Sequence, residues 1–169
     1  MAKGTYYDVV FSKASNKKII EILKEFGLTK DFNDDFHCTL VYSKTVCTKL
    51  KTSKNNKQKK DREDNEYKAK NPINILCSIK DFGHFDTDDG KNLHIELDSS
   101  WCSAQHKRAL DAGCTSDYPE YKAHVTLMYD CKDFSINDEL SKKFIGEKLQ
   151  MIEERITPLN ENWVEDSTS

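Results

Sequence analysis

The sequence predicts an α+β fold, because segments with a two-residue hydrophobic period alternate with segments that carry a helical stripe. A second observation is a weak internal repeat. In each half of the chain, a helical segment is followed by a strand that contains His-x-Thr-Leu. The length of 169 residues fits one domain over residues 1–169. A charged, polar stretch at about 51–70 is expected to be a loop inserted into that domain.

The first half begins with a strand over Thr5–Phe11, in which every second residue is apolar. A helix follows, with Ser15 as the expected N-cap and Gly27 as the residue that closes it. The next strand, Phe36–Tyr42, contains the first His-x-Thr motif. The charged insertion comes after this strand, and Asn71-Pro72 is expected to end it.

The second half repeats the pattern with more strands. The turn residues 88–91 predict a hairpin, and Gly113 is the expected end of a second helix. Trp101 and Leu110 are among the residues that this helix is expected to bury. The expected elements are strands over Ile73–Phe82 and Leu93–Leu97, a helix from about Ser99 to Ala112, a motif strand over Ala123–Tyr129, a last strand over Leu149–Ile156, and a tail after it.

Composition excludes several classes of function. The formal net charge of -3 gives the whole chain no basic footprint for duplex nucleic acid. No apolar run approaches the roughly 20 residues that cross a bilayer, and the start lacks a signal peptide, so we expect a cytoplasmic protein. The six cysteines have scattered spacing and no Cys-x-x-Cys, so we expect free thiols, no metal and no cofactor.

The two motifs are His37-Cys38-Thr39 and His124-Val125-Thr126, each followed by leucine. The period of two places the histidine and the threonine on one strand face and the apolar residues on the other. A matched pair in matching strands is hard to explain as accident. The polar faces are therefore expected to line a cleft.

Two imidazoles and two hydroxyls are suited to phosphodiester chemistry. One neutral histidine can accept a proton from the nucleophile while a protonated one donates to the leaving oxygen. The threonines would hold the non-bridging oxygens. A zinc site would use the same histidines, but no third ligand has convincing spacing. The sequence does not decide which histidine is the base.

The paired motifs resemble those of the 2H phosphoesterase superfamily. That resemblance implies a pseudo-symmetric, two-lobed fold with antiparallel sheets around a central cleft and helices outside. Three further segments, Lys3–Tyr6, Tyr118–Ala123 and Pro158–Trp163, are similar to the phage anti-CBASS protein 1 family over nearly the whole chain. This implies metal-independent hydrolysis of 3',5'-phosphodiester bonds in cyclic di- and trinucleotide messengers such as 3',3'-cyclic GMP–AMP. The protein would act in the cytoplasm of an infected bacterial host, so that the phage evades antiviral signalling.

The resemblance also implies residue roles. It makes His37, Thr39, His124 and Thr126 catalytic, and assigns Tyr6 and Trp163 to stacking on the bases. The family has a base-contacting acidic residue shortly before the tryptophan. Thr157 occupies that position here, with Glu154 nearby and Glu161 as another acidic candidate.

Two other functions stay open from sequence. One is an RNA-processing 2',3'-cyclic phosphodiesterase, and the other is a non-catalytic sponge that binds cyclic nucleotides. The preferred base, the ring size and the oligomeric state are also left open.

Overall fold

The computed structural model describes residues 2–29, 32–33, 35–60, 66–87, 90–117, 120–131 and 138–160, apart from the side chains of 87 and 130. None of the helices in these ranges is long and apolar enough to cross a membrane. The elements are, in chain order, β1 (Gly4–Phe11), α1 (Lys13–Glu25), β2 (His37–Ser43), β3 (Lys59–Lys60), β4 (Tyr67–Thr87), β5 (Gly90–Asp98), α2 (Ser100–Asp111), β6 (His124–Cys131), α3 (Asp138–Phe144) and β7 (Lys148–Leu159).

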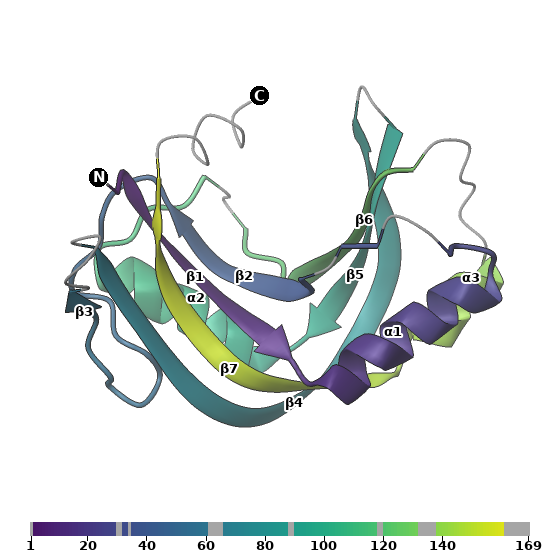
Figure 1. Ribbon diagram of the computed structural model, residues 1–169, viewed down its shortest axis with the longest axis horizontal. Coiled ribbons are helices and arrows are strands. Elements are labelled where there is room, and N and C mark those ends of the chain that lie inside the picture. Colours follow the sequence, from purple (N-terminus) through teal and green to yellow (C-terminus); the bar gives the residue numbers. More distant parts are fainter. Residues whose placement is uncertain are drawn as a thin grey trace.

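The strands form one sheet in the order β3-β4-β5-β6-β2-β1-β7, and every registered pair is antiparallel. The long β4 pairs with β7 through its first half and with β5 through its second half, which closes the order into a ring. The sheet curves, and the helices lie outside the curve (Figure 1). One face is therefore concave, and none of the three helices in the described part of the chain covers it.

The two motif strands are neighbours at the centre of this order. On one side lie β6, β5 and β4, and on the other lie β2, β1 and β7. Each motif strand pairs with the strand that precedes its helix, since β5 and α2 lead to β6 while β1 and α1 lead to β2. The two repeats predicted from the sequence thus lie side by side. The assignment to a 2H phosphoesterase-like fold stays a prediction.

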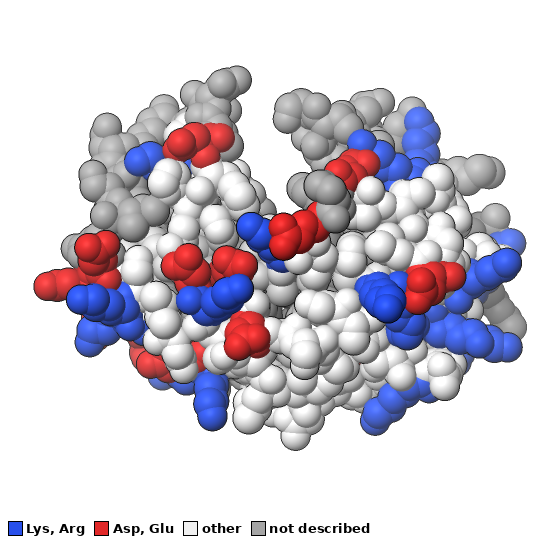
Figure 2. All heavy atoms as spheres, turned by 180° about the vertical axis from the view of Figure 1, so that it is seen from behind, with Lys and Arg blue, Asp and Glu red and all other residues white. Residues whose placement is uncertain are grey.

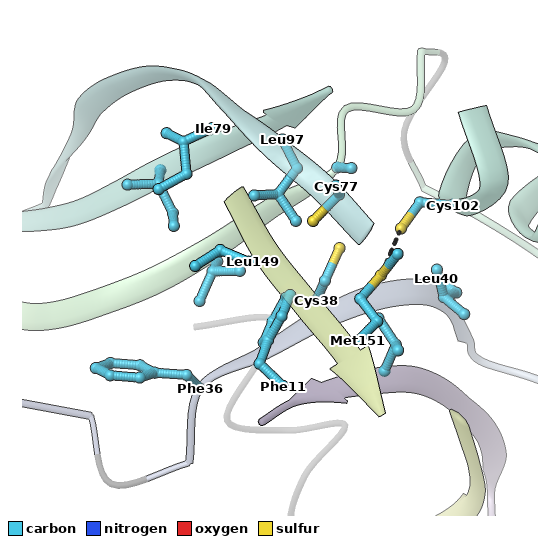
Figure 3. Packing of buried hydrophobic residues seen from close by; sticks show 14 of the residues in the cluster. Phe11, Phe36, Cys38, Leu40, Cys77, Ile79, Leu97, Cys102, Leu149 and Met151 are labelled. Carbon is cyan, nitrogen blue, oxygen red and sulfur yellow. Dashed lines mark hydrogen bonds between the residues drawn. The ribbon is translucent and has the colours of Figure 1, made fainter. Parts of the chain in front are cut away.

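The core lies between the helices and the face of the sheet that they cover. Side chains from several strands meet there with Cys102 of α2 (Figure 3). The Cys102 thiol lies 3.7 Å from the sulfur of Met151 on β7. On the other side, Phe82 of β4 stacks on Phe144 of α3 at a centroid distance of 5.2 Å. The helices therefore bury one face of the strands.

Several local predictions are corrected. Ser12 caps α1, because its hydroxyl accepts a hydrogen bond from the Ser15 amide. Asn71 and Pro72 lie inside β4 rather than ending the insertion, and the register with β7 shifts just after Pro72. A proline lacks the amide proton that a ladder needs, so a bulge accommodates it.

The buried face of α2 and the extent of two other elements also differ from the prediction. α2 buries Cys102, Gln105 and Ala109, whereas Leu110 is exposed and Trp101 is only partly buried. β7 extends three residues beyond the predicted end, to Leu159. α3 has no counterpart among the predicted elements, because its 7 residues, about two turns, give too short a stripe to detect.

The insertion is not a loop throughout. It contains β3 and the start of β4, and Thr52 within it is fully buried. The fully buried Glu154 of β7 holds it in place. The carboxylate of Glu154 accepts hydrogen bonds from the Ser53 amide at 2.6 Å, from the Ser53 hydroxyl and from Asn71 at 2.8 Å. The Tyr7 hydroxyl donates a further bond to it at 2.5 Å, and Arg108 of α2 donates to Tyr7.

Replacing Glu154 with alanine is expected to destabilise the protein strongly. The change would leave the buried donors of Tyr7, Ser53 and Asn71 unpaired, at a cost of about 3–5 kcal/mol. Urea unfolding measures the loss. The neighbouring Glu153→Ala, at a partly exposed position on the other face of the strand, serves as the control and should change stability by less than about 0.5 kcal/mol. Equal stability of the two variants would contradict the anchoring role.

Candidate active site

The two His-x-Thr motifs meet on one face of the sheet. Cys38 of β2 is registered with Val125 of β6, and both side chains are fully buried on the core face. Successive side chains in a strand point to opposite faces, so the residues that flank this pair point away from the core. Those residues are His37, Thr39, His124 and Thr126, and each is partly exposed.

The antiparallel register places the two histidines diagonally across from each other. His37 lies opposite Thr126, and Thr39 lies opposite His124. Cβ atoms of direct neighbours are roughly 5 Å apart and those of diagonal neighbours roughly 7–8 Å apart. The side chains therefore form a rectangle, with imidazoles at two opposite corners and hydroxyls at the other two. The concave surface around this rectangle is called the groove below.

Each histidine ring is held in the same way, by the backbone carbonyl of the residue two positions before it. The Nδ1 atom of His37 lies 2.7 Å from the carbonyl oxygen of Asp35, and that of His124 lies 3.0 Å from the carbonyl oxygen of Lys122. A carbonyl oxygen only accepts hydrogen bonds, so Nδ1 carries a proton in both rings whatever their charge. In its neutral form each ring therefore has its basic lone pair on Nε2.

Tyr6 of β1 lies against the Thr39 corner. Its hydroxyl is 2.6 Å from the Thr39 hydroxyl, and its ring meets those of His37 and Tyr42 edge-on at centroid distances of 6.1 and 6.0 Å. Burial raises the pKa of Tyr6 well above its ordinary value, so the phenol keeps its proton. When Tyr6 donates to Thr39, the proton of Thr39 is left to point elsewhere.

A charged cluster borders the groove on the His37 side. Arg155 of β7 donates to the carboxylate of Asp8 through Nε at 3.0 Å and through Nη2 at 2.6 Å. The hydrogen bonds to Asp8 raise the pKa of the Arg155 guanidinium, which therefore stays charged. Nη2 also lies 3.4 Å from the carboxylate of Asp35, the residue whose carbonyl holds His37. Arg155 thus steadies the segment that orients His37.

A third histidine, His94 of β5, lies beside the β6 motif. It is registered with Thr126, and its ring meets that of His124 edge-on at 5.9 Å. Phe85 stacks on the ring at 4.2 Å. Opposite His94 is Gly83, where an added Cβ would lie 3.2 Å from the imidazole. The glycine leaves space for this ring over β4.

Beyond Thr39, the registered pairing of β2 with β6 ends, and side chains contact the backbone carbonyls of β2 instead. The Tyr121 hydroxyl donates to the carbonyl of Thr39 at 2.8 Å, and Nδ1 of His106 lies 2.6 Å from the carbonyl of Leu40. The two rings stack on each other at 4.3 Å. These contacts satisfy strand carbonyls that β6 does not reach.

A cavity of about 330 Å³ opens at this point. Thr39 and His124 line it, together with the aromatic side chains of Tyr42, Phe85 and Tyr121. Phe85 is half exposed at its rim. The side of the rectangle formed by Thr39 and His124 therefore adjoins a space with aromatic side chains in its wall.

The residues predicted to bind the substrate are separated by the fold. Thr157 is registered with Tyr6 and shares the groove face. Glu154 lies on the opposite face and is fully buried, where it cannot contact a ligand in the groove, so its predicted role is corrected. Trp163 and Glu161 lie outside the described residues. The described part of the chain has no cluster of three or more His, Cys, Asp or Glu side chains that could hold a metal.

Other groove residues were missed. His94 and Glu96 alternate with apolar residues in the predicted strand Leu93–Leu97. This alternation could have indicated that both side chains share the polar face of the strand. Phe85 lies three residues beyond the end of the other predicted strand, Ile73–Phe82. The role of Arg155 depends on a register between the two ends of the chain, and no local pattern indicates it.

Comparison with known proteins gives a consistent result. The sequence model of the family described as "Anti-CBASS protein Acb1" matches residues 3–166. Vibrio phage KVP40 has an anti-CBASS protein Acb1 that is 25% identical over 167 residues, covering 96% of this chain and 92% of the relative. The protein of the same name from Escherichia phage RB16 is 26% identical over 130 residues, covering 76% of this chain and 65% of the relative. That from Enterobacteria phage T4 is 29% identical over 98 residues, covering 56% and 61%.

His94 is expected to be neutral at pH 7. Burial and then the neighbouring His124 lower the pKa of His94 below 6.5. Replacing His124 with asparagine removes the second cause, so the pKa of His94 should rise toward its ordinary value without reaching it. Titration of the imidazole by NMR measures both values. Since the unfolded chain takes up the proton first, this group lowers stability as the pH falls below 6.5. A pKa of 6.5 or above in the unsubstituted protein would contradict the placement of His94.

Proposed function

The chain belongs to the anti-CBASS protein Acb1 family, and from this membership and the geometry of the groove we propose that it hydrolyses 3',5'-phosphodiester bonds in cyclic di- and trinucleotide messengers. The hydrolysis needs no metal and lets a phage evade CBASS signalling in its bacterial host. The observation that carries the proposal is the rectangle of His37, Thr39, His124 and Thr126, in which both imidazoles have Nε2 as the reactive nitrogen. A 2H phosphoesterase-like fold is part of the proposal, and the symmetric strand order supports it.

The first step is an attack by the ribose 2'-hydroxyl. A neutral imidazole accepts the 2'-hydroxyl proton at Nε2 while the 2' oxygen bonds to phosphorus. The bond from phosphorus to the 5' oxygen breaks, and the second, protonated imidazole donates its Nε2 proton to that oxygen. The product is a 2',3'-cyclic phosphate on an opened chain. Water then opens the cyclic phosphate with the two histidines in exchanged roles.

The diagonal arrangement suits this displacement. The attacking and leaving oxygens lie on opposite sides of phosphorus, in line, while the non-bridging oxygens lie between them. Nε2 atoms at opposite corners can serve the two in-line oxygens. The hydroxyls at the remaining corners then lie beside the non-bridging oxygens, whose charge they stabilise as it develops.

Tyr6 fits a positioning role in this scheme. With the Tyr6 hydroxyl as the donor to Thr39, the Thr39 proton is turned toward the phosphate. The edge-on contacts of its ring with His37 and Tyr42 keep the hydroxyl in place. Base stacking is better served by Phe85, whose half-exposed ring lines the cavity next to His124.

His37→Ala and His124→Ala are each expected to lower turnover of 3',3'-cyclic GMP–AMP by about 10²- to 10⁴-fold, measured by mass analysis in the presence of EDTA. Ligand affinity should remain largely intact. A 2'-deoxy analogue should resist cleavage, because it lacks the nucleophile. His84→Ala is the matched control, since His84 points to the other face of β4 and pairs with Asp86.

The rival functions give different results in this experiment. An intact ring together with opened nucleoside 2',3'-cyclic phosphate would indicate the RNA-processing enzyme. Tight binding without turnover by the unsubstituted protein would indicate a sponge. Turnover that survives both histidine substitutions would show that the site is wrong.

The substitution Tyr6→Phe distinguishes a role of Tyr6 in orienting Thr39 from a role in stacking on a base. If Tyr6 orients Thr39, loss of the hydroxyl should lower kcat about tenfold with little change in KM, because only the transition state loses a donor. If its ring stacks on a base, Tyr6→Phe should be nearly silent and Tyr6→Ala should raise KM. Steady-state kinetics of the two variants distinguish these outcomes, and a silent Tyr6→Phe would remove the positioning role.

A further inference from the structure

Positive charge is concentrated in one part of the chain. Residues 49–70 contain nine Lys or Arg and four Asp or Glu, a net charge of +5, so the rest of the chain carries -8. Blue side chains gather on the side of the molecule where β3 lies, at the right of Figure 2. We call the described residues of this part, 49–60 and 66–70, the lysine ribbon.

The backbone of the lysine ribbon is held by hydrogen bonds within it and to its neighbours. The Asn55 amide donates to the carbonyl of Thr52, and the Thr52 amide donates to that of Asn56. The side chain of Gln58 donates to the carbonyls of Cys47 and Leu50 at 2.6 and 3.0 Å. With the Glu154 network beneath it, the backbone holds its lysines in fixed positions.

Lysines face lysines across the lysine ribbon. Lys51 is bridged to Lys57, and Lys59 of β3 is registered with Lys68 of β4. Like charges directly opposite each other destabilise a strand pair. Within the described ranges, no ion pair involves the six lysines from 49 to 60. A bound polyanion would relieve this repulsion.

An exposed aromatic residue lies among these charges. Tyr67 is 38% exposed and is registered with Lys60, whose Nζ lies 6.0 Å from the centre of its ring. Cations that follow a backbone, with an aromatic ring on which a base can stack, are the features that bind single-stranded nucleic acid. Bases in a duplex are already stacked and offer no face to such a ring.

We propose that the lysine ribbon binds the phosphate backbone of single-stranded nucleic acid, with Tyr67 stacking on a base. The cyclic substrate is a poorer match, because two or three phosphates cannot engage lysines distributed along the whole ribbon. None of these residues lines the cavity beside His124. The proposal is therefore independent of catalysis in the groove.

Fluorescence anisotropy with labelled oligo(dT) at several NaCl concentrations tests the proposal on the full chain. Oligo(dT) lacks the 2'-hydroxyl and so is not a substrate for the proposed reaction. Binding should weaken with salt. The double variant Lys57→Glu with Lys59→Glu should bind about tenfold or more weakly, and its salt slope should fall by about 1.4, since single strands give roughly 0.7 per phosphate contact.

The control makes the same change of charge elsewhere. Lys142→Glu with Lys143→Glu alters α3, at the other end of the molecule (Figure 1), and should leave oligo(dT) affinity within about twofold. Equal losses in the two double variants, or no binding at low salt, would overturn the proposal. A second ribbon pair, Lys54→Glu with Lys60→Glu, gives the same test if the first pair does not fold.

Two further arms identify the ligand. Oligo(dT) should bind more tightly than a duplex of equal length, and Tyr67→Ala should remove that preference. Equal binding of both would overturn the single-strand assignment. Cleavage of cyclic GMP–AMP should be unchanged in the ribbon variants, whereas a salt-dependent fall in kcat/KM without oligo(dT) binding would show that the lysines steer the cyclic substrate instead. His37→Ala should still bind oligo(dT), which separates this surface from the proposed catalysis.

Discussion

The pairing of β2 with β6 at Cys38 and Val125 is the constraint on which the groove depends. One registered pair brings both motifs to one face and sets the histidines on a diagonal. A shift of the register by two residues would bring imidazole opposite imidazole and lose the arrangement that in-line displacement needs. Burial of both side chains resists such a shift, because Cys38 and Val125 are packed in the core.

Beyond this pair, the site depends on side chains that take the place of backbone hydrogen bonds between β2 and β6. Tyr121 and His106 satisfy the carbonyls of β2, and the space between the strands becomes the cavity. A continuous ladder between β2 and β6 would have filled it. The same polar groups therefore stabilise an interrupted sheet and leave a cavity beside His124.

Strict alternation made the motif strands predictable, because each His and Thr is flanked by residues that can only be buried. Glu154 was predicted to bind the substrate, and this was wrong because β7 does not keep strict alternation. The register between β1 and β7 shifts near Val10, which turns Glu154 to the core face with Ile156. The contact that anchors the charged insertion could not be predicted either, since Ser53 is fixed by Glu154, a residue about a hundred positions away. Contacts of that range leave no local pattern.

Ring closure by the last strand has a consequence for biosynthesis. β7 pairs with β1, which begins at Gly4, and with the first half of β4, so it joins segments made early and midway. Until β7 leaves the ribosome, β1 and β4 each have an unpaired edge, and such edges promote association with other chains. The sheet can then close only after β7 has been made, and a nascent chain halted before β7 is exposed to aggregation and to proteases.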